Sequence, residues 1–267
     1  MDADRVAETL VSTTIKGAVG FVTMQNPQQR NALSQAMMLA LADALRQFEK
    51  TEQVRAIIIT AEGTVFCAGH DLKELDAHRR DNDKGQAFFI ETMRLCTGLM
   101  LQIVRHPKPI IAEIGGIATA AGCQLVASCD LAIASNKAQF ATPGVNIGLF
   151  CSTPMVALSR NVSRKHAMEM LLLGDMIDAA TAKEFGLVNK IVPHDELRAT
   201  TNAFAQRLAE KPALTITRGK SAFYEQCDMS LTQAYEFTGA IMVENMLAAD
   251  AKEGISAFIE KRKPAWE

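Results

Sequence analysis

The chain has 267 residues, a formal net charge of −2 and 48% hydrophobic residues. Such a length and apolar content suffice for one large domain with a full core. The near-neutral charge gives no electrostatic reason to expect nucleic acid or an anionic membrane as a partner, and we find no apolar run long enough to cross a bilayer.

The six cysteines lie mostly among apolar or small residues. Without an export signal they are expected to be reduced and buried. No Cys-x-x-Cys motif or His/Cys cluster indicates a metal site, so we expect no metal. The N-terminus, residues 1–5, lacks a signal-peptide pattern and is too acidic for a transit peptide, which predicts a cytoplasmic protein.

The first third of the chain predicts strands alternating with helices. Residues 11–24 read as a hairpin with its turn at Lys16–Gly17, and residues 26–31 as a polar loop. Ser34 is a good N-cap for a helix to about Lys50, and residues 55–60 form an apolar strand.

A glycine-containing loop, residues 62–75, then enters a short helix. Residues 76–84 are charged and read as a surface connection. Residues 88–105 predict a long amphipathic helix, which His106–Pro107 ends.

The central stretch is organised as a strand, a glycine turn and a helix of small residues. Residues 110–114 are apolar and β-branched, Gly115–Gly116 breaks the strand, and residues 118–122 are small. The first N–H groups of such a helix lack internal partners and can hold a negative oxygen. The alternative is that the glycines only make the turn and the alanines only allow close packing.

Beyond this stretch the chain becomes helical. Residues 131–134 predict another strand and residues 142–149 a loop, and helices follow from Pro154, apart from a short strand at residues 188–192. Strands alternating with helices, followed by helices, predict an α/β core with a C-terminal helical part.

Several segments together resemble the enoyl-CoA hydratase/isomerase (crotonase) family, in its order and with its spacing. They include Phe-Cys-Ala-Gly-His-Asp-Leu-Lys, where the family usually has Phe-x-Ala-Gly-Ala-Asp-Leu-Lys. The segments are residues 26–34, 66–73, 115–125, 138–148 and 258–263. Residues 120–125 and 147–154 are also similar to one particular branch of the family.

The resemblance implies a spiral of ββα turns, here a core of residues 1–200, and a C-terminal helical trimerisation region, residues 201–267. It implies a homotrimer or hexamer that binds an acyl-CoA thioester, located in the mitochondrial matrix if the source is eukaryotic. Coenzyme A is then part of the substrate, and no further cofactor is expected.

The resemblance also implies roles for single residues. The backbone N–H groups of His70 and Ala121 would form an oxyanion hole around the thioester oxygen. The loop around these donors would contact the nucleotide, helped by side chains from a neighbouring helix or subunit. The implied substrate-binding residues are Ala68, His70, Asp71, Leu72, Lys73, Ala121, Phe258 and Lys261.

The chain departs from the family at both positions where a hydratase has a catalytic glutamate. These positions hold Gln124 and Gly144. An amide can hold a water but cannot cycle a proton, and glycine offers no side chain. The alternative is an alignment slipped by a few residues, which the matching neighbours Cys123, Leu125 and Pro143 disfavour.

Other residues could carry a proton: Glu113, Glu74, Asp76, His70 and Cys151. Glu113 lies on the central strand, where an ion pair is its expected role. His70 could act as an acid or base near neutral pH, whereas Cys151 is expected to line the acyl pocket.

Three functions therefore stay open. The first is an enzyme that acts on an acyl-CoA or enoyl-CoA thioester by a route other than two-glutamate hydration. The second is a thioester-binding protein without turnover, and the third is a slow hydratase or isomerase that uses another base. A dinucleotide oxidoreductase is disfavoured because the central stretch lacks Gly-x-Gly-x-x-Gly.

Overall fold

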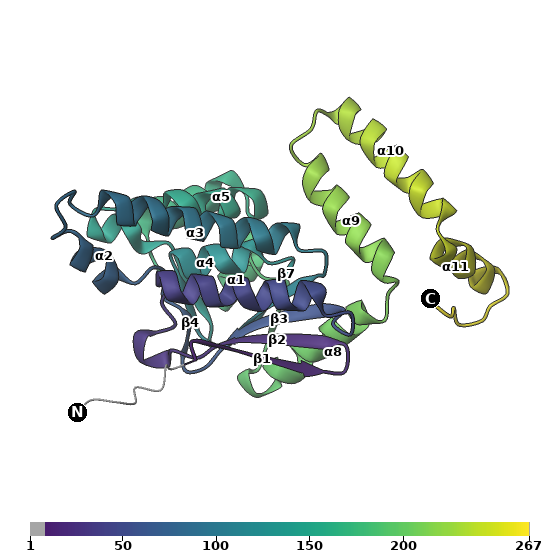
Figure 1. Cartoon of the computed structure of the whole chain (residues 1–267), viewed down its shortest axis with the longest axis horizontal. Helices are drawn as coiled ribbons and strands as arrows, with labels where there is room; N and C mark the ends of the chain where they lie inside the picture. Colours follow the sequence, from purple (N-terminus) through teal and green to yellow (C-terminus); the bar gives the residue numbers. More distant parts are fainter. Residues whose placement is uncertain (1–8, 267) are drawn as a thin grey trace.

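The computed structural model describes residues 9–266 (Figure 1), so the N-terminal segment 1–5, on which the localisation prediction rests, lies outside it. Two sheets form the framework, in the strand orders β1-β2-β3-β5-β7-β10 and β4-β6-β8-β9. The strands are β1 Val11–Lys16, β2 Val19–Met24, β3 Ala56–Ala61, β4 Val65–Cys67, β5 Ile110–Ile114, β6 Ile117–Thr119, β7 Leu131–Ser135, β8 Gln139–Ala141, β9 Ile177–Asp178 and β10 Lys190–Val192.

Helices surround the sheets and continue beyond them. The α-helices are α1 Gln35–Lys50, α2 Leu72–His78, α3 Gln86–Arg105, α4 Ala121–Ser128, α5 Ser152–Asn161, α6 Arg164–Leu173, α7 Ala179–Phe185, α8 Leu197–Ala209, α9 Ala213–Gln226, α10 Leu231–Leu247 and α11 Ala249–Ile259. Three 3₁₀ turns complete the described elements: η1 Pro27–Gln29, η2 Pro143–Ile147 and η3 His194–Glu196.

The chain winds as a spiral in which successive strands alternate between the sheets. The pairs β3/β4, β5/β6 and β7/β8 each place their first strand in the six-stranded sheet and their second in the four-stranded one, and a helix follows each pair. Neighbouring turns pair in parallel, as Ile57 with Ile110 and Ile117 with Gln139 show. This arrangement confirms the predicted α/β spiral of ββα turns.

The inner strands of the six-stranded sheet, β2, β3, β5 and β7, are buried on both faces, as their apolar sequences require, whereas the edge strand β1 is partly exposed. Ile57, Ile59 and Ala112 face the cluster that includes α1, α3 and α4. Ile58 and Ile111 face the other way, where α8 packs against the sheet. Successive side chains of β5 therefore point to opposite faces of the sheet and pack in different clusters.

Most predicted elements are confirmed, with shifts at their ends. The hairpin forms, but its turn is Gly17–Ala18. Ser34 caps α1 through its hydroxyl, which accepts a hydrogen bond from the Met37 N–H at 3.1 Å. Helix α3 begins at Gln86 rather than Phe88, because the Asp83 carboxylate accepts hydrogen bonds from the N–H groups that precede the expected start.

The C-terminal helices α9–α11 extend away from the sheets on one side of the molecule (Figure 1). Helix α10 packs on α9 and α11, and none of its residues is buried in the single chain. The predicted boundary at residue 200 falls inside α8, which belongs to the sheet layer, and the two-part division stays a prediction. The large apolar side chains exposed on α9–α11 are Leu214, Phe223, Leu231, Tyr235, Met242, Val243, Met246, Leu247, Ile255, Phe258 and Ile259.

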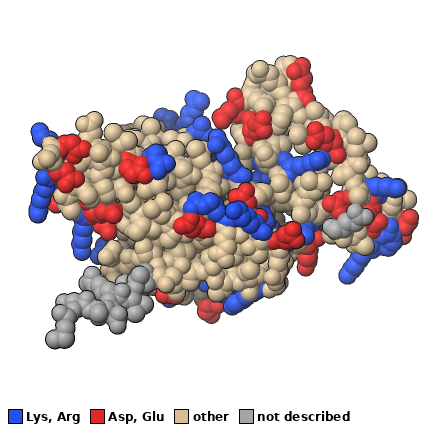
Figure 2. All heavy atoms as spheres, in the orientation of Figure 1, with Lys and Arg blue, Asp and Glu red and all other residues tan. Residues whose placement is uncertain are grey.

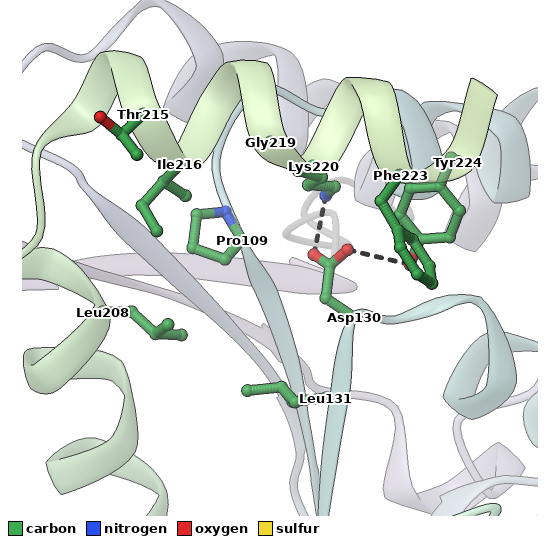
Figure 3. A pocket seen from close by; sticks show the side chains of 10 residues that line it. All are labelled: Pro109, Asp130, Leu131, Leu208, Thr215, Ile216, Gly219, Lys220, Phe223 and Tyr224. Atoms are coloured by element: carbon green, nitrogen blue, oxygen red, sulfur yellow. Dashed lines mark hydrogen bonds and ion pairs between the residues drawn. The ribbon is translucent and has the colours of Figure 1, made fainter. Parts of the chain in front are cut away.

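A partly buried ion pair fixes α9 to the core (Figure 3). Lys220 donates to the Asp130 carboxylate at 2.7 Å, and Tyr224 donates to its other oxygen at 3.0 Å. Burial lowers the pKa of Lys220, while the Asp130 carboxylate beside it opposes that effect. The same contacts border a cavity of about 340 Å³, lined mostly by apolar side chains such as Leu131 and Ile216. Nothing in the sequence signalled this pairing between distant segments.

The structure bears on two predictions about partners: that the charge does not favour nucleic acid or an anionic membrane, and that no segment could span a bilayer. Acidic and basic side chains are interspersed on the face drawn in Figure 2, in keeping with the near-neutral charge. By length and composition alone α3 could cross a membrane, contrary to the sequence prediction that no segment could. In the fold it packs against α1 and α4 through buried residues such as Leu99 and Ile103, as a core helix does.

Candidate functional site

Two loops that are distant in sequence meet where the resemblance places the oxyanion hole. Gly69, with φ +91°, follows β4, and a Cβ atom there would lie 2.8 Å from Ala120 Cβ and 3.2 Å from Ala121 N. Thr119 donates a hydrogen bond to the Ala68 carbonyl at 3.1 Å across the same contact. The loop after β4 therefore lies directly against the start of α4.

Ala120 begins α4 in a strained backbone conformation. Its φ of 50° and ψ of −120° are rare for a residue with a side chain and cost about 1–3 kcal/mol. The Ala120 N–H donates to the Ala141 carbonyl at 2.9 Å, and the Ala120 carbonyl accepts from the Gln124 N–H at 3.1 Å. Ala121 is thereby the first helical residue, so its N–H has no acceptor inside the helix and lies at the positive end of the helix dipole.

His70 is held at the facing loop by Leu33. The Leu33 N–H donates to the Gly69 carbonyl at 2.8 Å, and His70 Nδ1 lies 3.3 Å from the Leu33 carbonyl oxygen. Burial lowers the pKa of His70 below its usual value, so its ring is neutral at pH 7. The residues that the resemblance gives as the two N–H donors thus belong to loops in contact.

Gly122 lets α4 approach β4 closely enough for this contact. A Cβ atom at Gly122 would lie 2.1 Å from the Cys67 carbonyl oxygen, a distance that no real contact allows. Every residue of α4 is buried. The small residues of the central stretch therefore serve close packing, and that same packing positions the N–H of Ala121: the two interpretations of the stretch are compatible.

A cysteine lies beside each of the two positions expected to hold glutamates. Gln124 is 5% exposed, and the thiol of Cys96 on α3 lies 3.8 Å from its Oε1. At Gly144, a Cβ atom would lie 2.7 Å from the Leu149 carbonyl oxygen and 2.9 Å from Cys151 Sγ. The space that a side chain at Gly144 would need is thus occupied by the chain itself.

The carboxylates considered as proton carriers have structural partners. Glu113 accepts from Thr60 Oγ1 at 2.9 Å and pairs with Arg198 at 3.0 Å. Two residues apart on β5, Glu113 and Ile111 point to the same face of the sheet, the face that α8 covers. Arg198 lies on α8, so the predicted ion pair is confirmed. Asp71 caps α2 by accepting from the N–H groups of its first turn.

The other candidate proton carriers also have other roles or the wrong protonation state: these are Glu74, Asp76 and Cys151. Glu74 accepts a hydrogen bond from the first N–H of α1, that of Gln35, at 3.2 Å. Asp76 is exposed and lies 3.9 Å from Arg79. Burial raises the pKa of the Cys151 thiol, which keeps it protonated at pH 7 and disfavours a nucleophilic role.

The residues expected near the nucleotide fall into two groups. Asp71, Leu72 and Lys73 form the cap and first turn of α2, next to His70, and the Leu72 side chain is 53% exposed. Phe258, 86% exposed, and Lys261 lie at the end of α11, on the opposite side of the molecule from α2 (Figure 1). One chain alone does not bring the two groups together.

One residue essential to this architecture had no role assigned from the sequence. Asn31 is fully buried, and its amide donates to the carbonyls of Glu62 and Val65 at 2.9 and 2.8 Å. Its own oxygen accepts from the Asn26 N–H at 2.9 Å. The Asn31 side chain thereby joins the loop before α1 to the strand pair β3/β4. The only signal in the sequence was an asparagine at the end of the polar loop, residues 26–31.

A sequence profile described as enoyl-CoA hydratase/isomerase matches residues 14–267. The chain belongs to the enoyl-CoA hydratase/isomerase family. It is 47% identical over 258 residues to the mouse enoyl-CoA hydratase domain-containing protein 3, mitochondrial, covering 96% of this chain and 84% of that protein. The human protein of the same name is 46% identical over 245 residues, covering 92% and 79%.

Solved structures of the family share the fold. That of human enoyl-CoA hydratase domain-containing protein 3 superposes with a TM-score of 0.91 at 45% identity, covering 96% of this chain and 100% of that chain. An enoyl-CoA hydratase from Bacillus anthracis, 26% identical, gives 0.89 and covers 96% and 98%. The predicted similarity of residues 120–125 and 147–154 to one branch of the enoyl-CoA hydratase/isomerase family is confirmed, since the mouse and human relatives carry that branch's name.

Proposed function

We propose that the chain binds acyl-CoA or enoyl-CoA thioesters and holds the thioester oxygen between the N–H groups of His70 and Ala121. The observation that carries this proposal is the contact of Gly69 with Ala120 and Ala121, which brings the two donor loops together. A bound thioester oxygen gains charge as the carbonyl is activated, and each aimed donor is typically worth ~10²–10³ in rate. Coenzyme A is part of this substrate, and the proposal needs no other cofactor.

We further propose that the reaction is not ordinary two-carboxylate hydration. Gln124 cannot cycle a proton, and Gly144 has neither a side chain nor space for one. The chain then acts on the thioester by another route. A binding protein without turnover is the second candidate, favoured because neither position carries a carboxylate.

A screen of acyl-CoA thioesters tests this proposal, with binding and consumption measured separately. Calorimetry with a saturated thioester such as butyryl-CoA should show binding at or below millimolar concentration, and mass spectrometry should then show which thioesters are consumed. Consumption of any thioester supports an enzyme, and binding without consumption supports the second candidate. If neither saturated nor unsaturated thioesters bind, the assignment of the site is wrong.

The exposed apolar side chains of α9–α11 support a proposal about assembly. A single chain leaves Leu247, Phe258 and Ile259 between 72% and 86% exposed, which is costly in water unless a partner covers them. We expect a homotrimer or hexamer in which α11 of one chain brings Phe258 and Lys261 toward the nucleotide bound by its neighbour. A light-scattering mass equal to one chain at micromolar concentration would contradict this.

A mitochondrial location is proposed from the relatives. The mouse and human proteins carry the word mitochondrial in their names. That agrees with the matrix location expected for a eukaryotic source, and a cytoplasmic location is the alternative. Microscopy of the tagged full-length protein in its source cells distinguishes the two.

A further inference from the structure

The side-chain amide of Gln124 has a fixed orientation. Gln124 is only 5% exposed, and the thiol of Cys96 on α3 donates to its Oε1 across 3.8 Å. Burial raises the pKa of the Cys96 thiol to about 11, so the thiol keeps its proton at pH 7 and acts as the donor. Because Oε1 accepts from Cys96, the NH₂ group of the same amide points away from that thiol.

The NH₂ group of Gln124 has no acceptor in the described part of the chain. Nε2 donates to no residue within 9–266, and it is not one of the unpartnered polar side-chain atoms that are shielded from solvent. It therefore borders space that a ligand can enter. A side chain this deeply buried that leaves two N–H donors open at a candidate site calls for a functional explanation.

Helix geometry places this amide near the proposed donor to the thioester oxygen. Gln124 follows Ala121 by three residues, so both lie on one side of α4. Side chains of a helix lean toward its N-terminus, which brings the Gln124 amide over the turn that begins at Ala121. Two sets of N–H donors, about one helical turn apart, thus lie on the same side of α4, and a ligand with two acceptor oxygens would satisfy both.

The surroundings of the amide favour a neutral acceptor over a carboxylate. Burial raises the pKa of the thiols of Cys96, Cys123 and Cys151, so all three are uncharged at pH 7. The ion pair of Glu113 with Arg198 lies on the other face of the six-stranded sheet, where α8 packs. A carboxylate desolvated beside Gln124 would lack a positively charged partner, whereas a carbonyl oxygen needs only the N–H donors.

We propose that the site selects 3-oxoacyl-CoA thioesters, whose carbonyl oxygen at C3 accepts from the Gln124 NH₂ group while the His70 and Ala121 N–H groups hold the thioester oxygen. This inference rests on the proposed thioester site and names its substrate class. The two oxygens of such an acyl group belong to C1 and C3, a separation that suits donors on neighbouring positions of one helix turn. A saturated or 2-enoyl group has one oxygen and leaves the Gln124 donors unpaired.

Calorimetry with the full chain tests the proposal by comparing acetoacetyl-CoA with butyryl-CoA, which has the same number of acyl carbons but no oxygen at C3. Wild type should bind acetoacetyl-CoA about 3–10-fold more tightly, the usual net value of one hydrogen bond. Gln124→Met, similar in length but without a donor, should abolish this preference and leave the affinity for butyryl-CoA nearly unchanged. The matched control is Gln102→Met on α3, where the amide donates to the Ala42 carbonyl at 3.0 Å, and it should keep the preference.

Two further measurements test the orientation of the amide. Cys96→Ala removes the donor that fixes Oε1 and should weaken the preference, whereas Cys96→Ser keeps a donor and should retain it; this pair also serves if Gln124→Met does not fold. The infrared band of acetoacetyl-CoA labelled with ¹³C at C3 should shift to lower frequency on binding to wild type. Gln124→Met should lose that shift, which a merely structural role of Gln124 would not affect.

The outcomes separate this inference from the proposed function. If wild type binds acetoacetyl-CoA and butyryl-CoA equally, or if the preference persists in Gln124→Met, Gln124 does not select an oxygen at C3 and the thioester site stands. Malonyl-CoA carries a carboxylate at C3, and its binding more tightly than acetoacetyl-CoA would overturn the choice of a neutral acceptor. If no thioester binds, both ideas are overturned.

Discussion

Wild-type protein is expected to hydrate crotonyl-CoA at least about 10²-fold more slowly than ordinary enzymes, which turn over at roughly 1–10³ s⁻¹. Hydration needs one group to activate water and one to deliver a proton, and Gln124 and Gly144 supply neither. Loss of the enoyl absorbance measures the rate. A wild-type rate in the ordinary range would mean that another base does this work, with His70 first in line.

Restoring the carboxylates should show why both are needed. Gln124→Glu alone should do little, because the opposite side of the water stays unsupported. Adding Gly144→Glu should raise hydration measurably, provided that the chain accommodates the side chain. Gly144 is not among the described glycines with positive φ, so its backbone conformation accepts a side chain. What opposes the glutamate is steric overlap of its Cβ with neighbouring atoms.

A third substitution, Cys151→Ala, makes room for the glutamate at position 144. Cys151→Ala removes the sulfur that would lie 2.9 Å from the new Cβ, but the Leu149 carbonyl at 2.7 Å must still move. The triple variant should therefore be less stable than Gln124→Glu, and its thermal midpoint must be measured before its rate is interpreted. A folded triple variant that gains no hydration would contradict the assignment of these two positions.

Gly122→Ala is expected to weaken thioester activation by about 10²–10³-fold, the typical value of one oxyanion donor. The added methyl group cannot lie 2.1 Å from the Cys67 carbonyl, so α4 must move away from β4 and take the N–H of Ala121 with it. Overpacking of this kind also costs about 1–3 kcal/mol of stability. The consumption rate of whichever thioester the screen identifies, together with chemical denaturation, measures both effects.

Gly98→Ala is the matched control for this change. Gly98 also lies in a helix, α3, but a Cβ atom there meets nothing within 4 Å. Replacing an unneeded helical glycine should stabilise the chain by roughly 0.5–1 kcal/mol and leave activity unchanged. If Gly122→Ala behaves like Gly98→Ala, the close approach of α4 to β4 does not position the donor.

Local chemistry made much of the fold predictable from the sequence. Ser34 signalled the start of α1 because a cap acts within one turn, and the glycines around β4 and α4 signalled tight turns. The resemblance of residues 66–73 and 115–125 to a family placed two donor loops together that no local rule could pair. Their contact at Gly69 is what the structure adds.

The parts that could not be predicted depend on side chains that meet across long stretches of chain. Cys151 fills the space beside Gly144, and Lys220 reaches Asp130 from α9. His70 Nδ1 likewise lies 3.3 Å from the carbonyl of Leu33, a residue 37 positions earlier in the chain. Such pairings are set by packing in three dimensions, and a sequence period or a capping motif contains no information about them.

The most direct test of the account is the carbonyl stretching frequency of a bound thioester, measured by infrared difference spectroscopy with ¹³C-labelled butyryl-CoA. Two N–H donors aimed at the oxygen weaken the C=O bond, so the band should shift to lower frequency on binding to wild type, and Gly122→Ala should lose part of that shift. A bound thioester whose band stays at its value in water, or moves higher, would contradict an oxyanion hole formed by His70 and Ala121.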